Sequence, residues 1–377
     1  MNRVEYWLAA AVLRVLGLVC SLLPRRRRRI VLATARVSTL EGNLLHLRDA
    51  IEARHPKLEC VLLLEPYGYG RRRKLAYLGR LIRGMYYLQT ARLFIVDNAY
   101  LPIHVARHRP GTTVVQVWHA AGALKRFGAD TAAGLEEPDR TFLHRNYDYV
   151  VVSAEAARGP YSTALRTPID RVVALGSPRT DFFFSPDATF AARRRVLDLL
   201  PELRGRRVVV YAPTFRGRGA RKHAATGLDA RRLRAALPPG DVLVLKSHPN
   251  LGAAAPPVEG FDVVVDPALN LNELFTVTDV LITDYSSCVF EFALLGRPIV
   301  LLVGDLEAYE RDPGLYLDYR TEMIGTRVAD TDGVAAAILG DEFDFSGYDA
   351  FIERHLGPRP GTSSARFVEH FLGDRRP

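Results

Sequence analysis

The sequence predicts an α/β protein built from two doubly wound, Rossmann-like halves, and three observations support this. From Ile30 onward, short apolar runs rich in β-branched residues alternate with helical patterns, as in the βαβ units of a parallel sheet. The chain has 377 residues, enough for two domains with cores of their own. Polar clusters directly follow four of the expected strands, and such sheets bind ligands at the carboxyl ends of their strands.

The expected elements fall into two series, divided by a turn-rich stretch at residues 166–180. The first series has helices at 43–54, 74–89 and 154–165, and strands at 30–34, 59–64, 92–96, 113–117 and 149–153. The second has strands at 172–175, 208–211, 242–245, 263–265, 280–283 and 299–303. We therefore expect four segments: a helix with a basic run (1–29), an N-terminal domain (30–170), a C-terminal domain (171–345) and C-terminal helices that close over the domains (346–377).

Composition excludes several classes of protein. Hydrophobic residues make up 48% and charged residues 25% of the chain, which is typical of a globular protein and not of a disordered one. The net charge of +9 includes the basic runs Arg25–Arg29 and Arg71–Lys74, which suit an anionic membrane surface or phosphate-bearing substrates. No DNA- or RNA-binding signature accompanies them, so no nucleic-acid partner is expected. Three widely spaced cysteines indicate a reducing compartment and neither a disulfide framework nor a zinc site.

The N-terminal stretch Trp7–Leu23 is almost wholly apolar and is interrupted only by Arg14. As a helix it would be about 26 Å long, shorter than a hydrocarbon core of ~30 Å. Five arginines follow it where a signal peptide would have its cleavage site, so a cleaved signal is not expected. Three placements stay open: an interfacial helix, a spanning anchor, or a terminal helix packed on the protein. In either membrane placement, the arginine run puts the following domain on the cytoplasmic side.

The four polar clusters contain the candidate site residues. They are Trp118, His119, Gly122 and Lys125 after the strand 113–117; Thr214 and Arg216 after 208–211; Lys246 and His248 after 242–245; and Asp284, Ser286 and Ser287 after 280–283. Because all four follow strand ends of the same kind, we expect them to face one cleft between the halves. These residues also have explanations that need no ligand. His119 could be a hydrogen-bonded histidine near the core, Lys246 and Arg216 could be solvated loop charges, and His248 could shape a turn before proline.

The last of these clusters has the form of a phosphate site. Side chains that cap helices follow a buried strand, and an apolar helical pattern, Cys288–Leu295, comes next. Backbone N–H groups and the positive dipole end of a helix there would bind phosphate. The alternative is an ordinary capped junction with no ligand. No HxH or HExxH pattern, no GxSxG elbow and no P-loop occurs, so no catalytic metal is expected.

The stretches WHAAGALKRFG, YAPTFRG, LKSHPN and DVLITDYSSCVFEFALLGRPIV resemble the CDP-glycerol glycerophosphotransferase family, the primases and polymerases of teichoic-acid-type polymers. The resemblance covers roughly residues 28–345. It implies GT-B architecture, with an acceptor-side N-terminal domain and a nucleotide-donor-binding C-terminal domain facing a central cleft. It also implies transfer of glycerol phosphate, or of another alditol phosphate such as ribitol phosphate, from a CDP-alditol to an acceptor hydroxyl. CMP is released, and no cofactor is needed.

The same resemblance assigns a role to each matching position. His119 becomes the general base, His248 and Arg216 would stabilise the pyrophosphate, and Lys246 is a weaker candidate for that role. Thr214, Ser286 and Ser287 would donate hydrogen bonds to the phosphates, and Glu291 would hold ribose or glycerol hydroxyls. Alanines at 120 and 121 depart from the family, which usually has glycine directly after the catalytic histidine.

These observations predict a transferase bound to the cytoplasmic face of the cell membrane, peripheral or monotopic. Its expected partners are a nucleotide-activated alditol, a lipid-linked or glycan acceptor and the anionic membrane surface. The alternative is a glycosyltransferase of the same fold that uses a nucleotide sugar for envelope glycan synthesis. A non-catalytic lipid-bound scaffold is a third possibility, and four intact clusters at strand ends argue against it.

Overall fold

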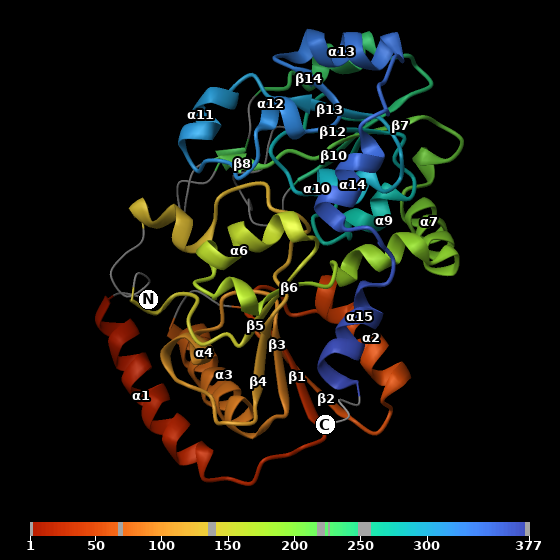
Figure 1. The fold of residues 1–377 in the computed structure, drawn as a ribbon. Coiled ribbons are helices and arrows are strands. Elements are labelled where there is room, and N and C mark those ends of the chain that lie inside the picture. The colour runs from red at the N-terminus through yellow and green to blue at the C-terminus, as the bar shows by residue number, and fades with distance from the viewer. Residues whose placement is uncertain are drawn as a thin grey trace. The chain divides into compact units, whose positions relative to one another are not determined.

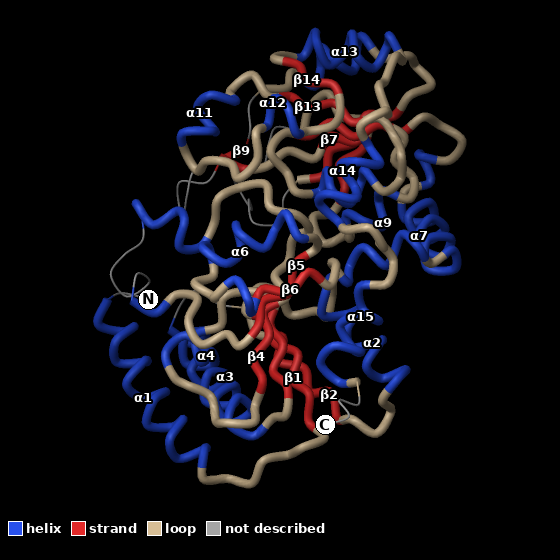
Figure 2. The backbone as a smooth tube through the Cα atoms, in the orientation of Figure 1, coloured by secondary structure: helices blue, strands red, loops and turns tan. Residues whose placement is uncertain are grey.

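The computed structural model describes residues 3–66, 71–134, 141–216, 223–224, 227–247 and 258–373. The chain forms two compact units, one of residues 1–181 and 354–377, the other of residues 182–353. Each unit contains a six-stranded sheet with helices on both faces (Figures 1 and 2). The predicted fold class, two doubly wound α/β halves, is confirmed.

The sheet of the first unit has the strand order β2-β1-β3-β4-β5-β6, and every pairing is parallel. Its strands are β1 Arg29–Thr34, β2 Glu59–Leu64, β3 Leu93–Val96, β4 Thr113–Gln116, β5 Tyr149–Val152 and β6 Val172–Ala174. All four residues of β3 are buried, so its unbroken apolar run is that of a central parallel strand covered on both faces.

The helices of the first unit form two layers around this sheet. They are α1 Arg3–Ser21, α2 Gly42–Arg54, α3 Arg71–Thr90, α4 Leu101–Val105, α6 Arg158–Ala164 and α15 Ser363–Leu372. On one face, Leu47 and Ile51 of α2 and Phe367 of α15 pack with Ile30 and Leu32 of β1. The helices α3 and α4 cover the other face, and α1 packs against both from outside (Figure 1).

The main sheet of the second unit has the order β11-β10-β7-β12-β13-β14, again with parallel pairings. Its strands are β7 Val208–Tyr211, β10 Val242–Lys246, β11 Val263–Val265, β12 Val280–Thr283, β13 Ile299–Leu302 and β14 Thr326–Val328. The helices are α7 Pro186–Leu199, α8 Ala230–Ala236, α9 Leu271–Phe275, α10 Cys288–Ala293, α11 Leu306–Arg311, α12 Tyr319–Glu322, α13 Thr331–Gly340 and α14 Tyr348–Leu356. A small antiparallel hairpin pairs β8 Phe215–Arg216 with β9 His223–Ala224.

The division between the halves lies later than the sequence predicts. The strand expected to open the second series is β6, which pairs with β5 in the first sheet, and the first unit continues to Asp181. A three-residue edge strand is too short for its apolar pattern to reveal which sheet it joins. The chain also returns to the first unit at Arg354, within α14, so the C-terminal segment 346–377 contributes to both units.

Candidate active site

The candidate residues of the first unit follow β4 and begin with a turn at Trp118. This residue has a φ of 51°, in the left-handed region that a tryptophan rarely adopts. Its N–H donates to Gln116 Oε1 at 2.9 Å. The side chain of Asn43 donates to the carbonyls of Val117 and Trp118, at 3.0 and 2.9 Å. The strained turn is therefore held from both sides, and it directs the next residue, His119.

The orientation of His119 is set by the end of the neighbouring strand β3. Its Nδ1 lies 3.0 Å from the carbonyl oxygen of Asp97. Because a carbonyl can only accept a hydrogen bond, Nδ1 carries the proton, and in the neutral ring Nε2 carries the lone pair. The indole of Trp118 packs beside the imidazole, with ring centroids 4.5 Å apart. This is the tautomer that a general base acting through Nε2 requires.

The carboxyl group of Asp97 lies close to this arrangement. The residue is 2% exposed, and burial raises its pKa to about 6 despite Arg36, whose guanidinium is 3.9 Å away. A further cation, Arg179, donates to the carbonyl of His119 at 2.7 Å. The backbone of the predicted base is thus fixed by charged as well as neutral groups.

Gly122 and Lys125 lie further along the same segment. Gly122 has a φ of 61°, donates its N–H to Ser153 Oγ at 3.0 Å, and accepts from the hydroxyl of Tyr161 at 3.0 Å. These contacts make Gly122 an anchor of the segment that follows the turn. Lys125 is half-buried there.

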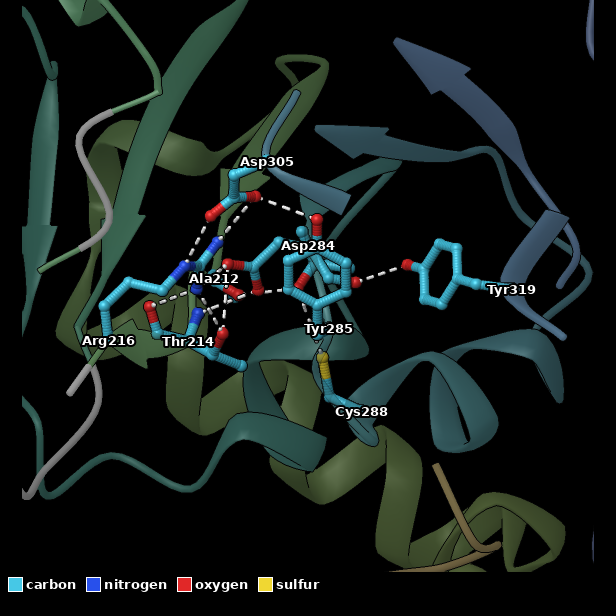
Figure 3. A network of polar contacts seen from close by, with 9 residues as sticks. Ala212, Thr214, Arg216, Asp284, Tyr285, Cys288, Asp305 and Tyr319 are labelled. Carbon is cyan, nitrogen blue, oxygen red and sulfur yellow. Dashed lines mark hydrogen bonds and ion pairs between the residues drawn. The ribbon is translucent and has the colours of Figure 1, made fainter. Parts of the chain in front are cut away.

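The second unit brings together the ends of β7 and β12, which are neighbours in its sheet. Asp284, after β12, accepts from the N–H and hydroxyl of Thr214, at 2.9 and 3.0 Å, and from Arg216 Nη1 at 2.8 Å (Figure 3). The hydroxyl of Tyr319 donates to the carbonyl of Asp284 at 2.6 Å. Asp284 is 2% exposed, so the bonds from Thr214 and Arg216 compensate for the burial of its carboxylate. The predicted meeting of these two clusters is confirmed.

Arg216 bridges two carboxylates. Its Nε donates to Asp305 Oδ2 at 2.8 Å, and its guanidinium carbon lies 5.0 and 5.1 Å from the ring centres of Tyr285 and Tyr309 (Figure 3 shows Tyr285). Burial alone would lower the pKa of Arg216, but Asp284 and Asp305 raise it. Burial would likewise raise the pKa of Asp305, but its hydrogen bonds to Arg216 and Tyr285 lower it. The guanidinium of Arg216 is therefore shared between two carboxylates. The cluster links the two loops that carry them and places a positive charge at the ends of β7 and β12.

The junction that was predicted to bind phosphate is shorter than expected. The helix α10 has six residues, Cys288–Ala293, and Ser287 precedes it without a side-chain capping bond. Ser286 Oγ accepts from the N–H of Cys288 at 3.4 Å. Both serines are half-buried, whereas Glu291 is 2% exposed and lies on a helix whose residues are all buried.

The third cluster of the second unit is only partly described. β10 is the other neighbour of β7, so its end lies at the same edge of the sheet. Lys246 is buried, and its Nζ donates to the carbonyls of Asp266 and Pro267, at 3.1 and 2.8 Å, which holds the loop after β11. The predicted residue His248 lies outside the described residues. Because the two units are described separately, the single cleft between them stays a prediction.

Sequence reasoning missed several partners. Asp97 and Asn98 follow the strand LFIV, so the argument from strand ends could have found them. Asn43 acts from the first turn of α2 and Asp305 from the residue before α11, and neither position gave a signal in the sequence. Among the described residues, no group of three or more His, Cys, Asp or Glu side chains is placed to hold a metal ion.

Comparisons with known proteins agree with the resemblance noted in the sequence. The profile of the family "CDP-Glycerol:Poly(glycerophosphate) glycerophosphotransferase" matches residues 17–372. The teichoic acid ribitol-phosphate primase of Bacillus spizizenii is 33% identical, over 94% of this chain and 94% of the primase. The teichoic acid poly(ribitol-phosphate) polymerase of the same organism is 31% identical over 94% of this chain, which spans only 58% of the polymerase.

Solved structures support the fold. A structure of the wall teichoic acid polymerase TagF superposes with a TM-score of 0.77 at 20% sequence identity, over 96% of this chain and 92% of that one. This likeness shows that the fold is of the GT-B type. The family profile covers nearly the whole chain, and the primase is similar over 94% of its length. The chain belongs to the CDP-glycerol:poly(glycerophosphate) glycerophosphotransferase family.

Proposed function

We propose that this protein transfers an alditol phosphate from a CDP-alditol to an acceptor hydroxyl, with release of CMP, in the synthesis of a teichoic-acid-like polymer. The observation that carries the proposal is the orientation of His119 at the end of β4. Its Nδ1 proton is held by the carbonyl of Asp97, so the lone pair lies on Nε2. A neutral imidazole in a fixed tautomer is suited to accept the proton of an alcohol.

The reaction then needs one proton transfer and one exchange of bonds at phosphorus. His119 Nε2 takes the proton of the acceptor's hydroxyl group, and the oxygen of that hydroxyl attacks the alditol-bearing phosphorus of the donor. The bond from that phosphorus to the bridging oxygen breaks, and CMP leaves with the electron pair. Because phosphoryl transfer depends mainly on positioning and charge neutralisation, the remaining task of the protein is to hold the diphosphate.

We assign the donor diphosphate to the second unit. The half-buried Ser286 and Ser287 follow β12, and the backbone N–H groups at the start of α10 are hydrogen-bond donors of the kind that phosphates accept. Thr214 and Arg216 are tied to Asp284 beside them. In this assignment, Arg216 orders the loop that encloses the phosphates and supplies part of the compensating charge.

The acceptor would reach the first unit from the membrane, and α1 supports this. One face of α1 packs on the protein: Ala10 and Leu13 are fully buried, and Arg14 Nε donates to the carbonyl of Val105 at 2.9 Å. The other face exposes apolar side chains that recur at helical spacing, namely Val4, Leu8, Val12, Val15, Leu18 and Val19, and the exposed Leu22 directly follows the helix. By length and hydropathy, Val4–Ser21 also qualifies as a membrane span.

We propose that α1 lies in the plane of the cytoplasmic leaflet and does not cross it. A helix held along one face by α3 and α4 can bury its opposite, apolar face in the lipid interface without leaving the protein. Of the arginine run, Arg26, Arg27 and Arg28 are exposed. Each exposed arginine would contribute about 1 kcal/mol near an anionic surface. Arg29 instead pairs with Glu59 at 3.3 Å.

The experiment is a donor panel with the full chain and a lipid-linked acceptor. CDP-ribitol, CDP-glycerol and a set of UDP- and GDP-sugars are offered separately, and the released nucleotide is measured. We expect CMP from the CDP-alditols, faster from CDP-ribitol because both curated relatives described above are ribitol-phosphate enzymes. Turnover of the sugar nucleotides alone would refute the proposal and establish the glycosyltransferase alternative.

A further inference from the structure

The first unit contains a buried polar network, centred on Tyr147, that the proposed reaction does not use. The hydroxyl of Tyr147 lies 3.1 Å from Gln116 Nε2, 2.9 Å from His104 Nε2 and 3.2 Å from His144 Nδ1. None of these four side chains is more than 6% exposed. Burial lowers the pKa of His144 to about 3 and lowers that of His104 well below its ordinary value, so both rings are neutral.

The hydrogen-bonding capacity of the phenol is fully used. A tyrosine hydroxyl has one proton to donate and two lone pairs that accept. The amide Nε2 of Gln116 can only donate, so it takes one lone pair. The hydroxyl must then donate to one histidine and accept from the other. All three contacts therefore depend on the one hydroxyl of Tyr147, and its loss would leave the buried polar groups around it without a hydrogen-bond partner.

Gln116 connects this network to the predicted base. Its Oε1 accepts from the N–H of Trp118 at 2.9 Å, and its Nε2 donates to the carbonyl of Asn98 at 3.1 Å as well as to Tyr147. Trp118 is the strained residue directly before His119, and Asn98 directly follows the residue whose carbonyl holds the imidazole. One amide therefore holds both backbone segments that orient the ring.

We propose that Gln116 and Tyr147 are positioning residues that hold the imidazole of His119 in its Nδ1–H tautomer. Gln116 fixes the left-handed turn at Trp118 and the backbone that directly follows β3, and Tyr147 fixes the amide of Gln116. The catalytic meaning of this rests on the proposed function, since His119 is the base only there. The orientation of the ring does not depend on that function.

The test compares three variants of the full chain. Tyr147→Phe removes the central hydroxyl, and Gln116→Met removes the three hydrogen bonds of the amide, to Trp118, Asn98 and Tyr147, while keeping the side-chain length. The matched control is Tyr348→Phe in the second unit, which also removes a buried tyrosine hydroxyl, one that donates to the carbonyl of Arg297 at 3.1 Å. Two readouts are taken: kcat and KM for CDP-ribitol, and the tautomer of His119 from the ¹⁵N shifts of histidine-labelled protein. A His119→Gln spectrum assigns the signal.

We expect wild type and Tyr348→Phe to show a single Nδ1–H tautomer of His119. Tyr147→Phe and Gln116→Met should show a tautomer mixture and lose about tenfold in kcat with the donor KM unchanged, as expected when a reacting group is displaced by less than 1 Å. If both variants keep the wild-type tautomer signal and kcat, as the control should, the proposal is overturned. If wild type turns over no CDP-alditol but the variants still alter the His119 signal, the positioning role stands and the proposed function fails.

Discussion

The two units place polar residues at the same kind of position, the carboxyl end of a parallel strand, but hold them differently. After β4, the ring of His119 is oriented by a hydrogen bond to the backbone carbonyl of Asp97 and by the strained turn before it. After β12, Asp284 is held by an ion pair with Arg216 that continues to Asp305. The first arrangement fixes the direction of one ring, and the second fastens separate loops together. Substitutions at His119 should therefore change the rate of the chemical step, and those at Asp284 should change stability and donor binding.

The largest expected effect is on catalysis in the first unit. His119→Ala should lower kcat by about 10²–10⁴-fold, the usual contribution of a general base, without loss of folded protein. CMP release under saturating donor measures the effect. The control is His55→Ala, a half-buried histidine at the end of α2. Full turnover by a folded His119→Ala protein would remove the assigned role.

The second unit should show the opposite behaviour, a loss of stability. Asp284→Ala removes the buried one of the two carboxylates that pair with Arg216, each at 2.8 Å, and breaking a buried pair costs about 3–5 kcal/mol of unfolding free energy. Asp305→Ala removes a carboxylate that is 47% exposed and should cost about 1 kcal/mol or less. Urea denaturation followed by circular dichroism compares the two. Equal losses of unfolding free energy would contradict the distinction between Asp284 as the buried partner of Arg216 and Asp305 as the exposed one.

The pH dependence of stability should reveal the buried acid of the first unit. The folded-state pKa of Asp97 is about 6, above the ordinary value of 3.8, so its ionisation works against folding as the pH rises from about 4 to 6. Asp97→Asn removes this cost and keeps the carbonyl that holds His119. At 1.36 kcal/mol per pH unit, it should stabilise the protein by about 3 kcal/mol at pH 7. The gain should shrink toward pH 4, and a gain that does not vary with pH would contradict the shift.

The smallest expected effect concerns the exposed face of α1. Leu8→Glu combined with Val15→Glu should weaken binding to phosphatidylglycerol vesicles at least about tenfold, because each change removes apolar area from the lipid interface. The matched control is Leu199→Glu, an exposed leucine of α7 in the second unit. Co-sedimentation measures the binding, and turnover of a soluble acceptor analogue should be unchanged. Equal binding by the variant and the control would refute the interfacial placement.

Much of the architecture was predictable because parallel strands that are buried on both faces are continuous apolar runs. β2, β7, β11 and β12 have the predicted bounds. The clusters at the ends of β7 and β12 were expected to meet, and they do. The strand β14 and the hairpin of β8 and β9 were missed because short, partly polar strands lack that pattern.

The fine structure of the site was less predictable. The ring of His119 bonds to the backbone carbonyl of Asp97, so the strand end could have been found in the sequence but the contact itself does not depend on a residue type. The second carboxylate at Arg216 comes from Asp305, far along the chain, and only the tertiary fold brings the two together. Lys246 shows the reverse case. Its position at the end of a strand made it a candidate for binding the pyrophosphate, and in the structure its amine donates to two carbonyls of a neighbouring loop.

The most direct test of alditol-phosphate transfer is the mass of the acceptor after reaction. A lipid-linked acceptor is incubated with CDP-ribitol and the full chain, and its product is analysed by mass spectrometry and ³¹P NMR. The acceptor should gain the mass of ribitol phosphate and a new phosphodiester signal, and His119→Ala should reduce both. An acceptor that is unchanged with CDP-alditols but gains a sugar residue from a nucleotide sugar would contradict the proposed reaction.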